Sequence, residues 1–289
     1  MPSYPEYDLG VQRAVLDTLG RAGVPVPRVL ALEEDRAFVG APFLVMSFVA
    51  GRPVADVVAF DPWIAAGGAE RGRAVEERFL DALGALHRVD RRLVDARAAL
   101  RRGVAADLAY WANYIDWAAD GSPARVLADA LDWCRRTVPT DDPDRHALCW
   151  GDARLGNVCF DPATAEVTAL LDWELATIGP PESDLAWYLA LGDLTAHFVG
   201  RRAVGALDRT AVISRYEAVL GRPVVDLGWH EVFALVRSVA INDRQARLAA
   251  DVGAEYPGVA GDANPVLAVL AERIERHTAD GADRDGGAQ

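Results

Sequence analysis

Lysine is absent from this 289-residue sequence, so all 30 of its basic side chains are arginine. A reaction that requires a lysine ammonium group must therefore use another cation or proceed without one. Cysteine is nearly as scarce, with three residues, Cys134, Cys149 and Cys159, that each lie among apolar neighbours. A small, odd number of cysteines in such surroundings favours buried free thiols over disulfides and predicts a cytoplasmic protein.

Long hydrophobic runs and an excess of positive charge are also missing. No apolar stretch reaches the roughly 18 residues that a membrane-spanning helix needs, and the opening MPSYPEYDLG lacks the features of a signal peptide. The formal net charge is −13. Nucleic acids and anionic membranes reward clustered positive charge, so we expect neither as a partner. The remaining composition, 51% hydrophobic and 25% charged, is typical of a globular protein.

The spacing of apolar residues predicts strands near the N-terminus and helices over most of the remaining chain. A helix is predicted over 8–22, followed by strands at 29–32 and 42–49. Two further strands are predicted at 158–160 and 167–171. The other predicted helices cover 73–88, 107–118, 123–137, 182–192, 208–220, 229–250 and 264–277. Residues 278–289 are polar and glycine-rich, which predicts a disordered tail.

Three oxygen-bearing side chains stand at the ends of short apolar runs between residues 149 and 186. Asp152 follows an apolar stretch and a glycine, Asn157 comes five residues later, and Asp172 ends the run VTALL. Phosphoryl transfer needs oxygen ligands for Mg²⁺ and a carboxylate near the acceptor hydroxyl. A D-x₄-N loop can point its carboxylate at a hydroxyl and its amide oxygen at the metal, which Asp172 can also bind.

The charged neighbours of these residues have two interpretations each. Arg154 can donate to the transferred phosphate, a task that falls to arginine in a chain without lysine, or it can pair with a nearby acid. Glu174 can approach a metal or substrate, or make a structural hydrogen bond.

His87 fits a packing role in a helix. The aromatic residues of 107–118 fit core packing, with the lining of an acceptor pocket as the alternative.

These motifs resemble the catalytic core of the aminoglycoside phosphotransferase family, whose members are relatives of the protein kinases. The matching segments read WGDARLGN at 150–157, LDWE at 171–174 and GPPESDLA at 179–186. The segments VPVPRVLAL and GAPFLVMSFVAGRPV, upstream, are similar to the strand, hinge and linker of one branch of the family. The resemblance covers about residues 7–275. Trp150 stands where the family often has histidine, and Pro180 replaces an acidic residue.

The resemblance implies an α+β, protein-kinase-like fold with a reduced N-lobe over 1–50 and a larger, mainly helical C-lobe over 51–277. It also implies an enzyme that moves the γ-phosphate of ATP or GTP, with Mg²⁺, to a hydroxyl of a small molecule. In that family Asp152 would be the catalytic base, assisted by Arg154, while Asn157 and Asp172 would bind Mg²⁺. Asp184 would hold the catalytic loop. The backbone of the hinge residues would meet adenine; these residues are Met46, Ser47 and Phe48.

The sequence departs from the family pattern in its N-terminal part. Only 23 residues precede VPVPR, no glycine-rich loop is visible, and the lysine that pairs with a helix glutamate is absent. We expect either that the natural protein begins further upstream or that the chain is a naturally shortened homologue. The rival function is a catalytically impaired binding or scaffold protein. The two N-terminal strands would leave an unpaired edge, which predicts association into a homodimer.

Overall fold

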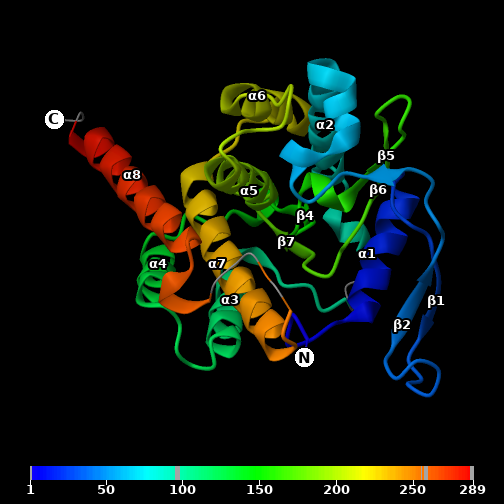
Figure 1. Ribbon diagram of the computed structural model, residues 1–289, viewed down its shortest axis with the longest axis horizontal. Helices are drawn as coiled ribbons and strands as arrows, with labels where there is room; N and C mark the ends of the chain where they lie inside the picture. The colour runs from blue at the N-terminus through cyan, green and yellow to red at the C-terminus, as the bar shows by residue number, and fades with distance from the viewer. Residues whose placement is uncertain (1, 95–97, 255, 257–259, 287–289) are drawn as a thin grey trace. The chain divides into compact units, whose positions relative to one another are not determined.

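The computed structural model describes residues 2–94, 98–254, 256 and 260–286, which form two compact units (Figure 1). Unit 1 comprises residues 1–6, 103–141 and 226–289, and unit 2 comprises residues 7–102 and 142–225. Residues 7–50 of the N-lobe expected over 1–50 belong to the same compact unit as the motif region. The division into an N-lobe over 1–50 and a C-lobe over 51–277 stays a prediction.

Among its described residues, unit 1 contains the 3₁₀ turn η5 (Gly261–Ala263) and four α-helices, which are α3 (Gly103–Ala118), α4 (Arg125–Arg136), α7 (Leu227–Asp251) and α8 (Val266–Gly286). Helix α7 packs against the other three. Trp111 and Tyr114 of α3 are fully buried, and the guanidinium of Arg237 lies 4.8 Å from the centre of the Trp111 ring. Core packing of these aromatic residues is therefore confirmed.

The end of α8 differs from the expectation for this part of the chain. Its helical backbone includes residues 278–286, where composition predicts a disordered tail, and residues 287–289 lie outside the described part of the chain.

Unit 2 contains four helices, seven strands and four short 3₁₀ turns in the described residues. In chain order its elements are α1 (Leu9–Arg21), β1 (Val29–Glu33), β2 (Phe43–Met46), β3 (Arg52–Pro53), η1 (Val58–Phe60), α2 (Pro62–His87), η2 (Arg91–Leu93), η3 (Pro143–Arg145), β4 (Ala147–Cys149), η4 (Leu155–Asn157), β5 (Val158–Phe160), β6 (Val167–Leu170), β7 (Thr177–Gly179), α5 (Glu182–Val199) and α6 (Arg209–Leu220). This mixture of helices and short strands confirms the α+β class.

The strands of unit 2 form three small antiparallel sheets. β1 pairs with β2, β4 pairs with β7, and β5 lies between β3 and β6. Strand β5 has the bounds that the sequence predicts. Strands β3, β4 and β7, which have two or three residues each, were not predicted, because such short strands show little periodic pattern.

Helix α1 covers the β1–β2 hairpin, which forms the outer, blue part of the ribbon in Figure 1. Asp8 caps the helix by accepting a hydrogen bond from the amide of Val11 at 2.8 Å, and the helix buries Val15, Leu16 and Leu19. Among the described residues, neither outer edge of the hairpin carries a further strand. Homodimer formation through this edge remains a prediction.

Helix α2 begins at an acidic cap and ends beside the motif region. The Asp61 carboxylate accepts hydrogen bonds from the amides of Trp63 and Ile64, both at 2.9 Å, and Pro62 occupies the first turn. The helix packs against α6, β4 and β6 and places His87 in the interior.

The cysteines and the apolarity of the helices bear on two expectations from the sequence. The three cysteines are free and buried, as expected. In the described part of the chain, no helix combines the length and apolarity that crossing a membrane requires.

Candidate active site

The loop between β4 and β5, residues 150–157, carries the first two predicted site residues. β4 pairs with β7 through Leu148 opposite Ile178, and all three residues of β4 are buried. The loop therefore starts from a fixed, buried strand and returns through the short turn η4 into β5, which is also buried. Asp152 and Asn157 lie at the two ends of a segment whose entry and exit are both held in the core.

The pairing of β5 with β6 brings the two predicted metal ligands together. Val158 of β5 is opposite Leu170 of β6, so the residues that flank this pair, Asn157 and Leu171, also meet. The Leu171 amide donates to the Asn157 carbonyl at 2.9 Å. Asp172 follows directly, in the left-handed backbone region at φ 62°, a conformation that non-glycine residues adopt mainly where the surrounding structure imposes it.

Three donors hold the carboxylate of Asp152. Oδ1 accepts from the indole nitrogen of Trp187 at 2.7 Å. Oδ2 accepts from the amide nitrogen of Asn157 at 2.7 Å and from Nε of Arg154 at 3.1 Å. The carboxylate is 17% exposed, so it is oriented and still accessible from outside. Such an arrangement can position a hydroxyl or accept its proton.

The Asn157 side chain has the orientation that a metal ligand would need. Its amide nitrogen also donates to the Asp152 carbonyl at 3.1 Å, while its carbonyl oxygen accepts no hydrogen bond from the residues that the structure describes. The backbone of Asn157 pairs with Leu171, the residue before Asp172, and an amide oxygen and a carboxylate are ligand types that Mg²⁺ prefers. The residues present therefore fit a magnesium ion.

The carboxylates of Asp152 and Asp172 lie close enough to neighbouring acids for their charges to change the pKa of those acids. Desolvation raises the pKa of Asp172, the charge of Asp152 raises it further, and Arg154 acts in the opposite direction. Glu174 has its pKa raised to about 7 by desolvation and by the charges of Asp172 and Asp152. Several carboxylates held close together repel one another unless a cation neutralises them. This arrangement is therefore consistent with a cation site.

Asp184, at the start of α5, fixes the first residues of the loop. Its carboxylate is fully buried and accepts hydrogen bonds from the amides of Trp150 at 2.6 Å and Gly151 at 2.8 Å. His87 Nε2 lies 2.9 Å from the same carboxylate, and His87 Nδ1 lies 2.6 Å from the hydroxyl of Tyr216. His87 is thus more than a packing residue, because it links α2 and α6 to the aspartate that holds the loop.

His87, Cys149 and Asp184 form a second group whose side chains could ligate a metal. One ligand atom from each residue lies within 4.8 Å of the others, and all three residues are buried. Their atoms are already engaged: the Cys149 thiol donates to the Gly179 carbonyl at 3.3 Å, and the other two form the network just described. Burial also raises the pKa of the Cys149 thiol well above its usual value, which disfavours a metal-binding thiolate. We therefore interpret the group as structural.

Trp150 connects the loop to the backbone of Asp172. Its indole nitrogen donates to the carbonyls of Leu171 at 2.8 Å and Asp172 at 3.0 Å, and its ring stacks on Trp173 with centroids 5.4 Å apart. The tryptophan at the position where the family often has histidine thus supports the strained Asp172 backbone.

Arg154 is engaged with two acids. Besides Asp152, it contacts Asp56, whose Oδ1 accepts from Nη1 at 2.6 Å. Asp56 precedes η1 and its side chain is 80% exposed. A Cβ atom at Gly156 would lie 2.8 Å from both partners, so glycine makes room for this ion pair. The geometry supports the salt-bridge interpretation of Arg154, and its predicted contact with phosphate remains a prediction.

The predicted hinge residues lie at and just after the end of β2, and among the described residues no hydrogen bond or ion pair joins them to the carboxylates. Met46 is 45% and Phe48 is 94% exposed. The Ser47 amide already donates to the Arg28 carbonyl at 2.8 Å, and its hydroxyl accepts from the Arg28 amide at 2.9 Å. An adenine would therefore have to use other backbone groups of this segment. The hinge assignment stays a prediction.

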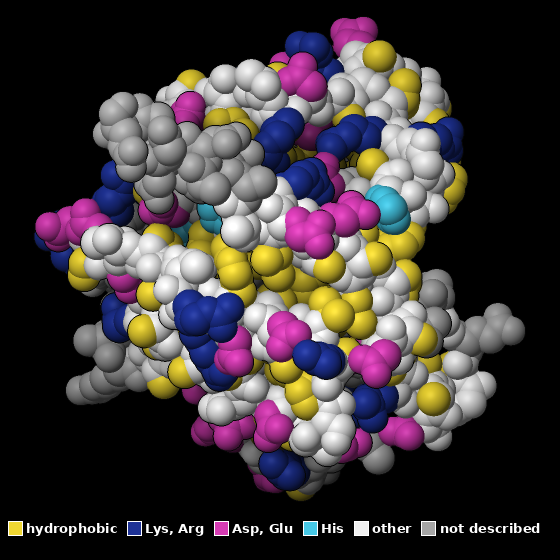
Figure 2. Space-filling view, turned by 90° about the vertical axis from the view of Figure 1, so that its left-hand side faces the viewer, with side chains coloured by type: hydrophobic (Ala, Val, Ile, Leu, Met, Phe, Trp, Pro, Cys, Tyr) yellow, Lys and Arg dark blue, Asp and Glu magenta, His cyan; other side chains and the backbone are white. Residues whose placement is uncertain are grey.

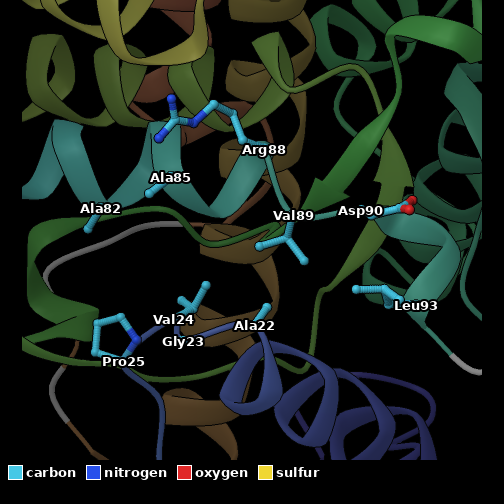
Figure 3. A pocket seen from close by; sticks show the side chains of 10 residues that line it. All are labelled: Ala22, Gly23, Val24, Pro25, Ala82, Ala85, Arg88, Val89, Asp90 and Leu93. Carbon is cyan, nitrogen blue, oxygen red and sulfur yellow. The ribbon is translucent and has the colours of Figure 1, made fainter.

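A surface pocket of about 330 Å³ lies elsewhere in unit 2, between the end of α1 and the C-terminal half of α2 (Figure 3). Its walls are mostly small or apolar, with Arg88 and Asp90 as the charged members. None of the carboxylates described above lines it, so it is separate from the candidate active site.

Figure 2 shows one face of the molecule, on which arginine and acidic side chains of the described residues are intermingled.

Sequence reasoning missed two residues that contact the site. Trp187 lies three positions after Asp184 on α5, and residues at this spacing share one face of a helix. The spacing in SDLAW could therefore have predicted that Trp187 faces the same loop as Asp184. Asp56 is nearly a hundred residues away from Arg154 in sequence, and no local pattern marks it.

Among known proteins, the chain is similar to two groups with different names. It is 32% identical over 193 residues to an aminoglycoside 3'-phosphotransferase of Streptomyces fradiae, covering 64% of this chain and 65% of that protein. It is 31% identical over 175 residues to acyl-CoA dehydrogenase family member 10 of Mus musculus, covering 60% of this chain and 16% of that protein. The chain thus spans less than a third of the length of the acyl-CoA dehydrogenase relatives.

Comparison with a solved structure confirms that this chain has the protein-kinase-like fold of the aminoglycoside phosphotransferases. A candidate aminoglycoside phosphotransferase of Ralstonia eutropha superposes with a TM-score of 0.73 at 25% identity, covering 92% of this chain and 83% of that one. The sequence model of the phosphotransferase enzyme family matches residues 8–218. The chain therefore belongs to the phosphotransferase enzyme family.

Proposed function

We propose that this protein transfers the γ-phosphoryl group of ATP or GTP to a hydroxyl group of a small molecule. The observation that carries the proposal is the Asp152 carboxylate, which three donors orient beside the adjacent Asn157 and Asp172. A loop with a purely structural role has no evident need for an oriented, accessible carboxylate next to a free amide oxygen and a second carboxylate. Family membership supports the same chemistry.

Each residue of the site has a role in this proposal. Asn157 and Asp172 would hold Mg²⁺, which when bound would neutralise charge on the phosphates. Asp152 orients the acceptor hydroxyl and takes its proton. Arg154, in a chain without lysine, is the cation within reach of the transferred group, although it would have to leave Asp56 to contact a phosphate. Met46, Ser47 and Phe48 would contact the base of the nucleotide.

The names of the relatives suggest two acceptor classes to test. One relative is an aminoglycoside 3'-phosphotransferase, so the hydroxyl groups of aminoglycosides form the first class. Several others are acyl-CoA dehydrogenases, which makes hydroxyl groups on acyl chains the second class. Because one fold and one core motif can serve many acceptors, these names define a substrate panel and leave the choice to experiment.

The second candidate function is a binding or scaffold protein with impaired catalysis. It is favoured by the absence of lysine and by the exposed hinge segment, which has few contacts to position a nucleotide. The candidates differ in their requirement for metal and nucleotide, so they can be separated by one experiment.

The test measures thermal unfolding of the purified protein with ATP or GTP, in Mg²⁺ and in EDTA. We expect a rise in melting temperature that requires both nucleotide and Mg²⁺, because a ligand that binds the folded state stabilises it. Asp172→Ala should abolish the rise. Release of nucleoside diphosphate is then followed with both acceptor classes present. A wild-type protein that shows neither a shift nor turnover would contradict the enzymatic proposal.

A further inference from the structure

The two oxygens of the Asp152 carboxylate carry different numbers of hydrogen bonds. Oδ2 accepts two, from Asn157 and Arg154, whereas Oδ1 accepts one, from the indole nitrogen of Trp187. Each carboxylate oxygen can accept about two hydrogen bonds. Among the described residues, Oδ1 therefore retains acceptor capacity, and it is the oxygen that Trp187 holds.

Trp187 comes from the helix that also anchors the loop backbone. Asp184 and Trp187 lie three residues apart on α5, so both side chains face the loop. Asp184 binds the amides of Trp150 and Gly151, and Trp187 binds the next residue through its side chain. One helix thus fixes both the backbone that leads to Asp152 and the direction of its carboxylate.

The other two donors to Asp152 are tied to further partners. Arg154 also pairs with the exposed Asp56, and its own side chain is 32% exposed, so water can compete for it. Asn157 also has the predicted task of offering its oxygen to a metal. Trp187 is neutral and only 4% exposed, so its hydrogen bond is better protected from water than that of Arg154, and it has no predicted task at the metal.

We propose that Trp187 is a positioning residue that directs Oδ1 of Asp152 toward the acceptor hydroxyl. The inference rests on the proposed function. In the transfer, the acceptor oxygen bonds to the γ-phosphorus, and the bond from that phosphorus to the bridging oxygen of the nucleotide breaks. The nucleoside diphosphate leaves, and the acceptor proton passes to Asp152. Arg154 can then exchange partners during the reaction while Trp187 keeps the carboxylate oriented.

A purely structural role for Trp187 would make it equivalent to other buried tryptophans. Trp63 provides the matched control, because it is 9% exposed, belongs to the same unit, and donates one indole hydrogen bond, to the Pro162 carbonyl at 3.1 Å. Phenylalanine at either position removes one N–H and retains an aromatic ring. Equal effects of the two substitutions would indicate that only packing matters.

The kinetic test compares Trp187→Phe, Trp63→Phe and wild type with the nucleotide and acceptor that support turnover. We expect kcat to fall about 10- to 100-fold in Trp187→Phe, the range for a misplaced catalytic group. The KM for nucleotide should stay within about twofold, and kcat of Trp63→Phe within about twofold of wild type. A kcat of Trp187→Phe close to that of wild type would overturn the inference while leaving the proposed function intact.

A spectroscopic test covers the case in which a tryptophan variant does not fold. The indole N–H signals of the ¹⁵N-labelled protein are compared between wild type and Asp152→Ala, with Trp187 and Trp63 unchanged. We expect the Trp187 signal to move strongly and the Trp63 signal to stay in place. An unchanged Trp187 signal would overturn the inference. Absence of all turnover in wild type would instead defeat the proposed function, and the positioning role with it.

Discussion

The loop between β4 and β5 and the hairpin of β1 and β2 belong to the same compact unit but are held very differently. In the loop, buried side chains of helix α5 bind both the backbone and the Asp152 carboxylate, and His87 of α2 contacts one of them, Asp184. In the hairpin, Val45, Met46 and Phe48 are exposed, and among the described residues neither edge carries a further strand. The loop is held by buried hydrogen bonds, whereas the hairpin presents exposed apolar side chains that a ligand or a partner could cover.

This difference accounts for the two functions that the sequence leaves open. Holding an acceptor and metal site in place would cost buried polar groups and backbone strain, which a scaffold has no evident need to maintain. An exposed hinge lowers the affinity expected for nucleotide but does not remove the chemistry. We therefore expect the protein to be an enzyme that is limited by nucleotide binding.

The largest expected effect concerns the anchor of the loop. Asp184→Ala leaves the buried amides of Trp150 and Gly151 without their acceptor and removes the partner of His87. Loss of one partner from a buried charged network destabilises by about 3–5 kcal/mol. Urea titration of the variant should show this fall in the free energy of unfolding. A loss under about 1 kcal/mol would mean that the loop is not held as described.

Replacing one glycine in the loop and one in the hairpin by alanine compares how tightly the two regions are packed. Gly151 and Gly40 have nearly the same backbone conformation, with φ of 86° and 85°. A Cβ at Gly151 would lie 2.3 Å from the Leu175 carbonyl oxygen, whereas a Cβ at Gly40 would have no atom within 4 Å. Gly40→Ala should cost about 1–2 kcal/mol of stability from the left-handed backbone alone, and Gly151→Ala should cost clearly more. Similar melting temperatures for the two variants would remove the contrast between loop and hairpin.

The smallest effect on stability is expected in the hinge segment. Phe48 is 94% exposed, so Phe48→Ala should change the free energy of unfolding by less than about 0.5 kcal/mol. If the ring covers the base of the nucleotide, the KM for nucleotide should rise while kcat stays constant. Steady-state kinetics with varied nucleotide checks this. A large drop in melting temperature would show that Phe48 is part of the folded core.

Much of the fold could be predicted because it is encoded locally. Helix α1 and strand β5 follow from apolar spacing over a few residues, and the motif loop was located from the acids at the ends of short apolar runs. The pairing of β4 with β7 and the contact of Asp56 with Arg154 could not be predicted, since they join distant segments without a periodic signal. His87 was underestimated for the same reason: its partners, Asp184 and Tyr216, lie about a hundred residues away or more.

The central claim is that the carboxylate of Asp152 performs chemistry. It is tested most directly by measuring nucleotide turnover in wild type and in Asp152→Asn, which retains the shape of the side chain. We predict Mg²⁺-dependent turnover that falls about 10²- to 10⁴-fold in the variant, with a melting temperature close to that of wild type. Equal turnover in the two proteins would contradict the account.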